Sequence, residues 1–192
     1  MSEPEHAKWD ERHRGQPVGE PEPFLVEMIP RIPRIGIALD VAAGRGRNSL
    51  AMARAGIKVV AVDWSEAAMH TLALAARSER LAVWPVVANL DSFHLKDESL
   101  DAIVNINFLE RALFPKFSRA LKPGGVLIAE TFLIDQAGIG HPRDPRFLLG
   151  HGELRELAAN LEIEQYREGI VSYDDGTRTF RASMVARRGK NI

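Results

Sequence analysis

The sequence predicts an α/β fold in which helices cover both faces of a doubly wound, mostly parallel seven-stranded sheet with a C-terminal antiparallel hairpin. Three observations predict it. Apolar, strand-like runs alternate five times with helical segments after residue 34. Gly44 and Gly46 lie between the first such run and the first helix that follows it. The pair Asp175-Gly176 separates the last two strand-like runs, which is typical of a hairpin turn.

Residues 1–33 are expected to form a helical cap on a single domain whose core spans residues 34–192. The polar start of the chain predicts a short helix around residues 5–14, followed by a loop, although its composition fits a frayed tail equally well. The apolar run 24–29 predicts a second helix, which Pro30 ends.

From residue 35 the chain alternates between buried strands and helices. The run 35–42 is almost continuously apolar, which is typical of a strand covered on both faces. Ser65 is a good N-cap, and Gly56 ends a helix where a left-handed residue is favoured. Pro85 weakens the middle of the third strand because it cannot donate a ladder hydrogen bond. The expected strands are 35–42, 57–62, 81–87, 100–106 and 126–132, and the expected helices are 48–55, 66–77 and 110–121.

Such alternation predicts parallel strands joined by right-handed crossovers, and sheets of this kind bind ligands at the carboxyl ends of their strands. The polar residues near those ends are Asp40, Asp63, Asn89, Asn105 and Glu130. We therefore expect the functional site at this edge of the sheet.

The last third of the chain has a different pattern. A long polar loop is expected over residues 134–149, then a helix over 152–160 and two antiparallel strands over 163–173 and 177–187. In the last strand apolar and polar residues follow mostly a period of two. The apolar set is Phe180, Ala182, Met184 and Ala186, and the alternating set is Thr179, Arg181, Ser183 and Val185.

The composition excludes several classes of function. The chain has 25 Lys and Arg against 26 Asp and Glu, so a broad basic surface for nucleic acid is not expected. It has no Cys, which excludes disulfides, thiolate metal sites and cysteine nucleophiles, and its six His residues lack metal-ligand spacing. No apolar run is long enough to span a membrane, and residues 1–10 do not resemble a signal peptide. We expect a cytoplasmic protein without a metal, nucleic-acid or membrane partner.

The segment after the first strand predicts a nucleoside site. Gly44 and Gly46 let the backbone turn sharply into the N-terminus of a helix, and Asp63 ends the second strand, where an acid can accept hydrogen bonds from ribose hydroxyls. The dinucleotide fingerprint requires a third glycine, but Ser49 stands there. A ligand without a pyrophosphate is favoured. Asp40 could face an ammonium group, and backbone N–H groups of residues 44–48 could bind a carboxylate.

These residues resemble the motifs of the class I S-adenosylmethionine-dependent methyltransferases, and within them the small tellurite-resistance-type branch. The segment 40–48 resembles the first motif, with Ala42 where the first glycine usually stands. Val62–Ser65 resembles the second motif, which implies that Asp63 binds the ribose and Trp64 packs against the adenine. The alternative, which is less favoured, is that Trp64 is a core aromatic residue at a helix start.

The rest of the chain extends the resemblance. Residues 88–91 resemble the third motif, with Asn89 at the position of an acid that contacts the adenine, and residues 105–111 resemble the fourth, beside the transferred methyl group. Trp9–Arg12 resembles an N-terminal stretch that folds over the cofactor. The residues that the resemblance implies for cofactor binding are Trp9, Arg12, Asp40, Ala42, Gly44, Gly46, Asn48, Asp63, Trp64, Asn89, Leu90 and Asn105. The candidate catalytic residues are Asn105, Asn107 and Arg111.

The resemblance implies a Rossmann-like methyltransferase that uses S-adenosylmethionine, releases S-adenosylhomocysteine and acts on a small-molecule acceptor. Further acceptor-side candidates are Glu130, Thr131, His141 and Arg143. The alternative for each is a surface residue, and for His141 and Arg143 this alternative fits at least as well. Two alternatives remain open. One is a protein that binds S-adenosylmethionine without turnover, and a less favoured one is a nucleotide-dependent oxidoreductase.

Overall fold

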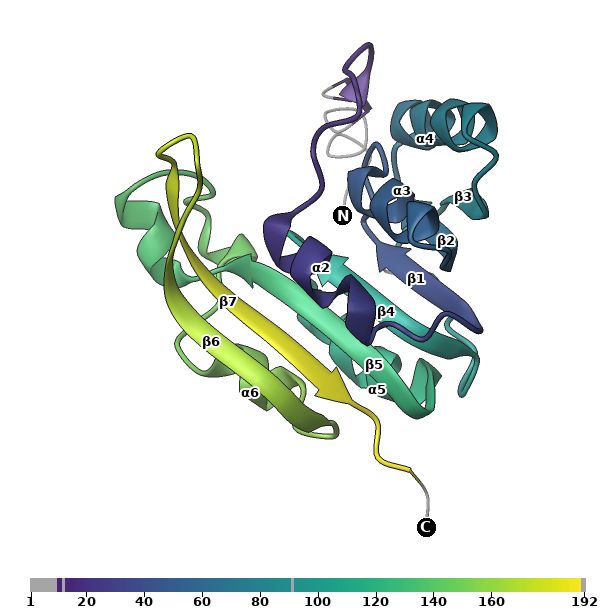
Figure 1. Cartoon of the computed structure of the whole chain (residues 1–192). Coiled ribbons are helices and arrows are strands. Elements are labelled where there is room, and N and C mark those ends of the chain that lie inside the picture. The colour runs from purple at the N-terminus through teal and green to yellow at the C-terminus, as the bar shows by residue number, and fades with distance from the viewer. Residues whose placement is uncertain (1–9, 12, 91, 191–192) are drawn as a thin grey trace.

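A computed structural model describes residues 10, 11, 13–90 and 92–190 of the chain. It contains one seven-stranded sheet in the order β3-β2-β1-β4-β5-β7-β6 (Figure 1). The first five strands pair in parallel, and β7 runs antiparallel between β5 and β6. The predicted fold class is confirmed. The strands are β1 (Ile37–Val41), β2 (Lys58–Asp63), β3 (Val83–Val87), β4 (Leu100–Ile106), β5 (Leu121–Phe132), β6 (Glu162–Ser172) and β7 (Arg178–Arg187).

Helices cover both faces of the sheet (Figure 1). On one face α2 and α3 pack on β1, β4 and β5, and α4 packs beside α3; on the other face α5 and α6 cover the apolar side chains of β4, β5 and β7. The α-helices are α2 (Pro23–Met28), α3 (Arg47–Arg54), α4 (Glu66–Ser78), α5 (Phe114–Ala120) and α6 (Glu153–Leu157). The 3-10 helices are η1 (Ile29–Arg31), η2 (Arg111–Leu113), η3 (Ile134–Gly138) and η4 (Pro145–Phe147). None of the helices in the described residues is long and apolar enough to cross a membrane.

One expected helix differs from the observed structure, and the strand that Pro85 was expected to weaken is present. The helix expected over 110–121 is divided into η2 and α5, because Pro115 lies in the first turn of α5, where a residue without an N–H can start a new helix. Pro85 is accommodated inside β3 because this strand is at the edge of the sheet and pairs only with β2.

The segment predicted as a long loop contains local structure, and part of the first predicted helix is observed. The segment 134–149 includes η3 and η4, and Leu133 and Leu149 form a parallel bridge at its ends. Of the helix expected around residues 5–14, the described residues 10, 11 and 13 are helical, and most of the remainder lies outside the described part. We call residues 13–22 the strap. It leads from the region of α4 across the end of β1 to α2 (Figure 1).

Candidate functional site

The loop between β1 and α3 is built from left-handed backbone. Ala42 has φ +53°, Gly44 has φ +53° and Gly46 has φ +81°. Such angles are open to glycine, but they cost a residue with a Cβ about 1–2 kcal/mol. Ala42, at the position where the related motif has glycine, is therefore a strained point in the loop.

The two glycines of this loop have different surroundings. A Cβ on Gly46 would lie 2.2 Å from Cδ1 of Leu72, so its missing side chain lets α3 and α4 pack closely. A Cβ on Gly44 would lie 3.5 Å from Cε1 of His13, on the strap. Gly46 thus has a packing role that the sequence pattern did not separate from ligand approach, and the cofactor contacts of both glycines stay predictions.

Asp63, at the end of β2, holds the loop in place. Its Oδ2 accepts a hydrogen bond from Gly44 N at 2.8 Å, and its Oδ1 accepts one from Ser65 N at 2.9 Å. Each oxygen of an ionised carboxylate can accept two hydrogen bonds. Asp63 therefore keeps acceptor capacity for the hydroxyls of a ribose while it joins the ends of β1 and β2.

Asp40, in β1, is a buried carboxyl group with one side-chain partner. It is 1% exposed, and its Oδ2 accepts a hydrogen bond from the Ser49 hydroxyl at 2.5 Å. Burial raises the pKa of Asp40 from 3.8 to about 7, and the nearby negative charge of Asp63 adds to the increase. A cationic ligand group bound close by would favour the ionised form of Asp40.

Two buried side-chain atoms among the described residues have no hydrogen-bond partner, and both lie at the edge formed by the carboxyl ends of the parallel strands. They are Nε of Arg45, in the loop after β1, and Oδ1 of Asn105, near the end of β4. The amide nitrogen of Asn105 donates to Phe108 O at 3.1 Å, so only its oxygen is unpaired. Buried polar atoms without partners are costly, and a polar ligand would satisfy them. The residues at this edge therefore fit a ligand such as S-adenosylmethionine.

The other predicted cofactor residues lie at the neighbouring strand ends. Trp64 follows Asp63 directly and is partly buried, while Asn89 and Leu90 follow β3. The Leu90 side chain is 4% exposed and belongs to the core. Trp9 and Arg12 lie outside the described residues.

The chain before α2 crosses the loop and is attached at both ends. Oδ1 of Asp10 accepts hydrogen bonds from the Ser65 hydroxyl and from Ala67 N, both at 2.9 Å. At the other end, Glu22 N donates to Oδ1 of Asn48 at 3.0 Å. Asn48, predicted to bind the cofactor, thus uses its side-chain oxygen to hold the strap.

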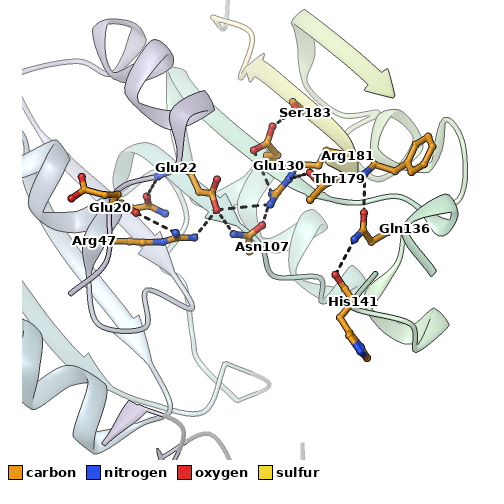
Figure 2. Close-up of polar contacts among 12 residues, drawn as sticks. Glu20, Glu22, Arg47, Asn107, Glu130, Gln136, His141, Thr179, Arg181 and Ser183 are labelled. Carbon is orange, nitrogen blue, oxygen red and sulfur yellow. Dashed lines mark hydrogen bonds and ion pairs between the residues drawn. The ribbon is translucent and has the colours of Figure 1, made fainter. Parts of the chain in front are cut away.

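A polar network continues from Glu22 to the ends of β4, β5 and the start of β7 (Figure 2). Oε1 of Glu22 accepts hydrogen bonds from Arg47 and from Nδ2 of Asn107, both at 2.6 Å. Oδ1 of Asn107 accepts one from the Arg181 guanidinium at 2.5 Å, and Arg181 lies 3.5 Å from Oε1 of Glu130. The predicted residue Asn107 therefore lies in a network whose other members come from distant parts of the chain.

Sequence reasoning missed Glu22 and Arg181 as site residues. A period of two is typical of a strand with one buried face, yet Arg181 is 5% and Ser183 1% exposed. The reason is that α2 packs on this second face of β7 at Val185, and that Arg181 lies 3.9 Å from Glu22 and 3.5 Å from Glu130. Burial raises the pKa of Glu130, which also accepts a hydrogen bond from the Ser183 hydroxyl. Arg181 is a charged residue inside a mostly apolar strand, and this was the one feature of the sequence that could have indicated its role in the site.

Arg111 anchors the segment that follows β5. Its guanidinium donates to both carboxylate oxygens of Glu153, at 2.5 and 3.1 Å, and to the backbone oxygens of Arg146 and Leu148, at 3.2 and 3.0 Å. These contacts give Arg111 a structural role, and its predicted part in methyl transfer stays a prediction. Of the other acceptor-side candidates, Glu130 and Thr131 are buried, whereas His141 and Arg143 are exposed.

Comparisons with known proteins concern the fold that carries these residues. Residues 38–125 match the family model described as a methyltransferase domain. A protein studied for the conversion of a disulfide bond into a thioacetal group during echinomycin biosynthesis has 20% identity and a TM-score of 0.75, with 98% of this chain and 94% of that chain covered. No curated protein matches the chain by sequence.

Two further solved structures share the fold. TehB from Haemophilus influenzae has 21% identity and a TM-score of 0.72, with 85% of this chain and 61% of TehB covered. A S-adenosylmethionine-dependent methyltransferase from Methanosarcina mazei has 21% identity and a TM-score of 0.71, with 90% of this chain and all of that chain covered. The architecture around the site is therefore shared along nearly the whole chain, beyond the 38–125 match.

Proposed function

We propose that this chain, which carries a methyltransferase domain on the class I methyltransferase fold, transfers the methyl group of S-adenosylmethionine to a small-molecule acceptor. One observation carries the proposal. The unpartnered buried atoms of Arg45 and Asn105 lie at the same edge of the sheet as the carboxyl groups of Asp40 and Asp63. A ligand that brings an ammonium, a carboxylate and ribose hydroxyls to this edge would satisfy them.

Different residues of the chain would bind different parts of the ligand. Asp63 has acceptor capacity for the ribose, and the buried Asp40 favours a positive group near the end of β1. Backbone N–H groups at the start of α3 offer a site for a carboxylate. S-adenosylmethionine, when bound, supplies a methyl group bonded to a cationic sulfur. The task left to the protein is to align the acceptor and to exclude water.

The acceptor side is expected beyond the end of β4, where Asn105 and Asn107 stand. Within the described residues, little chain lies outside the sheet and its covering helices, which supports a small acceptor. A thiolate or an oxyanion would need no general base, whereas a neutral acceptor would need one. Glu130 is a buried carboxyl group at the end of β5, with a raised pKa, and it is the candidate for that base.

Ligand binding is tested by thermal unfolding of the full chain. S-adenosylhomocysteine should raise the melting temperature, and NAD should not, because a ligand that binds only the folded state stabilises it. The Asp63→Ala variant should lose the shift. A shift with NAD and none with S-adenosylhomocysteine would mean that the chain is not a methyltransferase.

Turnover needs a separate measurement. Formation of S-adenosylhomocysteine from S-adenosylmethionine should be followed with thiols, selenium and tellurium oxyanions, small amines and phenols as acceptors. Acceptor-dependent product formation supports catalysis. Binding without product for every acceptor class would favour a protein that senses the cofactor instead.

A further inference from the structure

A single carboxylate oxygen joins segments that are far apart in the chain. Oε1 of Glu22 accepts hydrogen bonds from Arg47, in the first turn of α3, and from Asn107, just after β4 (Figure 2). The backbone N–H of Glu22 is bound by Asn48, also in the first turn of α3. Glu22 therefore contacts the helix that follows the cofactor loop and the residue next to the expected acceptor side.

The side chain of Glu22 is not used by its own helix. Glu22 is the N-cap of α2, a position whose side chain usually accepts a hydrogen bond from the first turn, yet it makes no such bond. It turns away to Arg47 and Asn107 instead. At 5% exposure the side chain is buried, so removal of the carboxylate, as in Glu22→Ala, would leave the two donors without an acceptor.

Asn107 connects Glu22 to Glu130 and Arg181. Its backbone is left-handed, with φ +60°, and its N–H donates to Glu130 O at 2.8 Å. With its two side-chain atoms bound to Glu22 and to Arg181, the amide has a single orientation. A displacement of Glu22 would therefore remove the acceptor of Asn107 Nδ2 and allow the Asn107 amide to turn away from Arg181.

We propose that Glu22 is a positioning residue that couples cofactor binding at the start of α3 to the arrangement of Asn107 and Arg181. This inference rests on the proposed function. A cofactor that orders the loop and the first turn of α3 stabilises the strap, and the strap then holds Asn107 in the orientation that the acceptor meets. By reciprocity, the loss of Asn107 weakens cofactor binding, and it does so only through Glu22.

The test is a double-mutant cycle on the affinity for S-adenosylhomocysteine, measured calorimetrically with the full chain well below its melting temperature. The variants are Glu22→Ala, Asn107→Ala and the double variant. Glu20→Gln is the matched control, because Glu20 is an exposed strap residue that contacts Arg47 only through its backbone oxygen. Glu22→Gln keeps the shape and an acceptor but removes the charge.

The coupling predicts a specific pattern. Glu22→Ala should weaken binding by about tenfold or more, Asn107→Ala by about threefold to tenfold, and the double variant no more than Glu22→Ala alone. Glu22→Gln should lie between the wild type and Glu22→Ala, and Glu20→Gln should stay within about twofold of the wild type. If Glu22→Ala fails to fold, the cycle is measured with Glu22→Gln.

Other results would overturn the inference. One is that the effects of Glu22 and Asn107 multiply, which would mean that the two residues act independently. Another is that Glu22→Ala lowers the free energy of unfolding without changing the affinity, which would leave it a purely structural role. A wild-type protein that does not bind S-adenosylhomocysteine would instead reject the proposed function, so the two failures are distinguishable.

Discussion

Replacement of Asp40 by Asn should change how the stability of the unliganded protein depends on pH. Asn has nearly the same shape, and its oxygen can still accept the hydrogen bond from the Ser49 hydroxyl, but it cannot ionise. In the folded protein burial raises the pKa of Asp40 from 3.8 to about 7. The variant therefore removes one titration and leaves the packing almost unchanged.

The sign follows from the protons that each state binds. Between about pH 4 and pH 7 folded Asp40 holds a proton that the unfolded chain has lost, so its contribution to the free energy of unfolding falls as the pH rises. A difference of about 3 pH units at 1.36 kcal/mol per unit gives about 4 kcal/mol. The stability of Asp40→Asn relative to wild type should rise by this amount across the window and level off above pH 7.

The assay is urea unfolding of both unliganded proteins at several pH values from 4.5 to 8. The difference between the two curves cancels the other titrating groups that they share. Asp97→Asn is the control, since Asp97 is 68% exposed and the same substitution there removes a carboxylate from the surface and not from the core. A flat difference for Asp40→Asn, or one that falls with rising pH, would refute the reasoning from burial.

Three further predictions concern the loop after β1 and the ion pair between Arg111 and Glu153. Ala42→Gly should raise the free energy of unfolding by about 0.5–1 kcal/mol, measured with urea, because Ala42 has φ +53°; an unchanged or lower value would contradict the strain. Gly46→Ala should lower it by about 2–4 kcal/mol, since the new Cβ would lie 2.2 Å from Leu72; a loss below about 1 kcal/mol would show that Leu72 moves easily. Glu153→Gln should cost about 0.5–1 kcal/mol at pH 7. Because Arg111 lowers the pKa of Glu153, this cost should be present at pH values above the ordinary pKa of Glu and should vanish as the pH falls through the lowered pKa of Glu153. A loss of stability that persists at acidic pH would show that the substitution disturbs packing instead.

Much of the fold could be predicted because the signals are local. The apolar run of β1, the glycines after it and the Asp175-Gly176 turn each lie within a few residues of the element that they predict. The division of helix 110–121 at Pro115 was missed, although the residue was visible, because helical periodicity continued across it. The position of β3 at the sheet edge, which accommodates Pro85, depends on strand order and not on local pattern.

Only part of the candidate site could be predicted from the sequence in the same way. The loop from Asp40 to Asn48 and the acid at Asp63 follow the strands that present them, so sequence spacing was enough to place them together. Spacing could not separate the packing role of Gly46 from a ligand contact, because Leu72 belongs to a different helix. Nor could it show that Arg111 binds Glu153 and the segment 146–148.

The sequence by itself determined the alternation of strands and helices, the nucleoside-type loop and the edge of the sheet where the ligand is expected. These depend on hydrophobic periodicity and on glycine and acidic residues at strand ends, which are properties of short segments. Only the tertiary structure decided that Glu22 meets Asn107, 85 residues away, and that Asn107 meets Arg181, 74 residues further on. Buried charges need partners, but which partners they find depends on how the strap and β7 pack over the ends of β4 and β5.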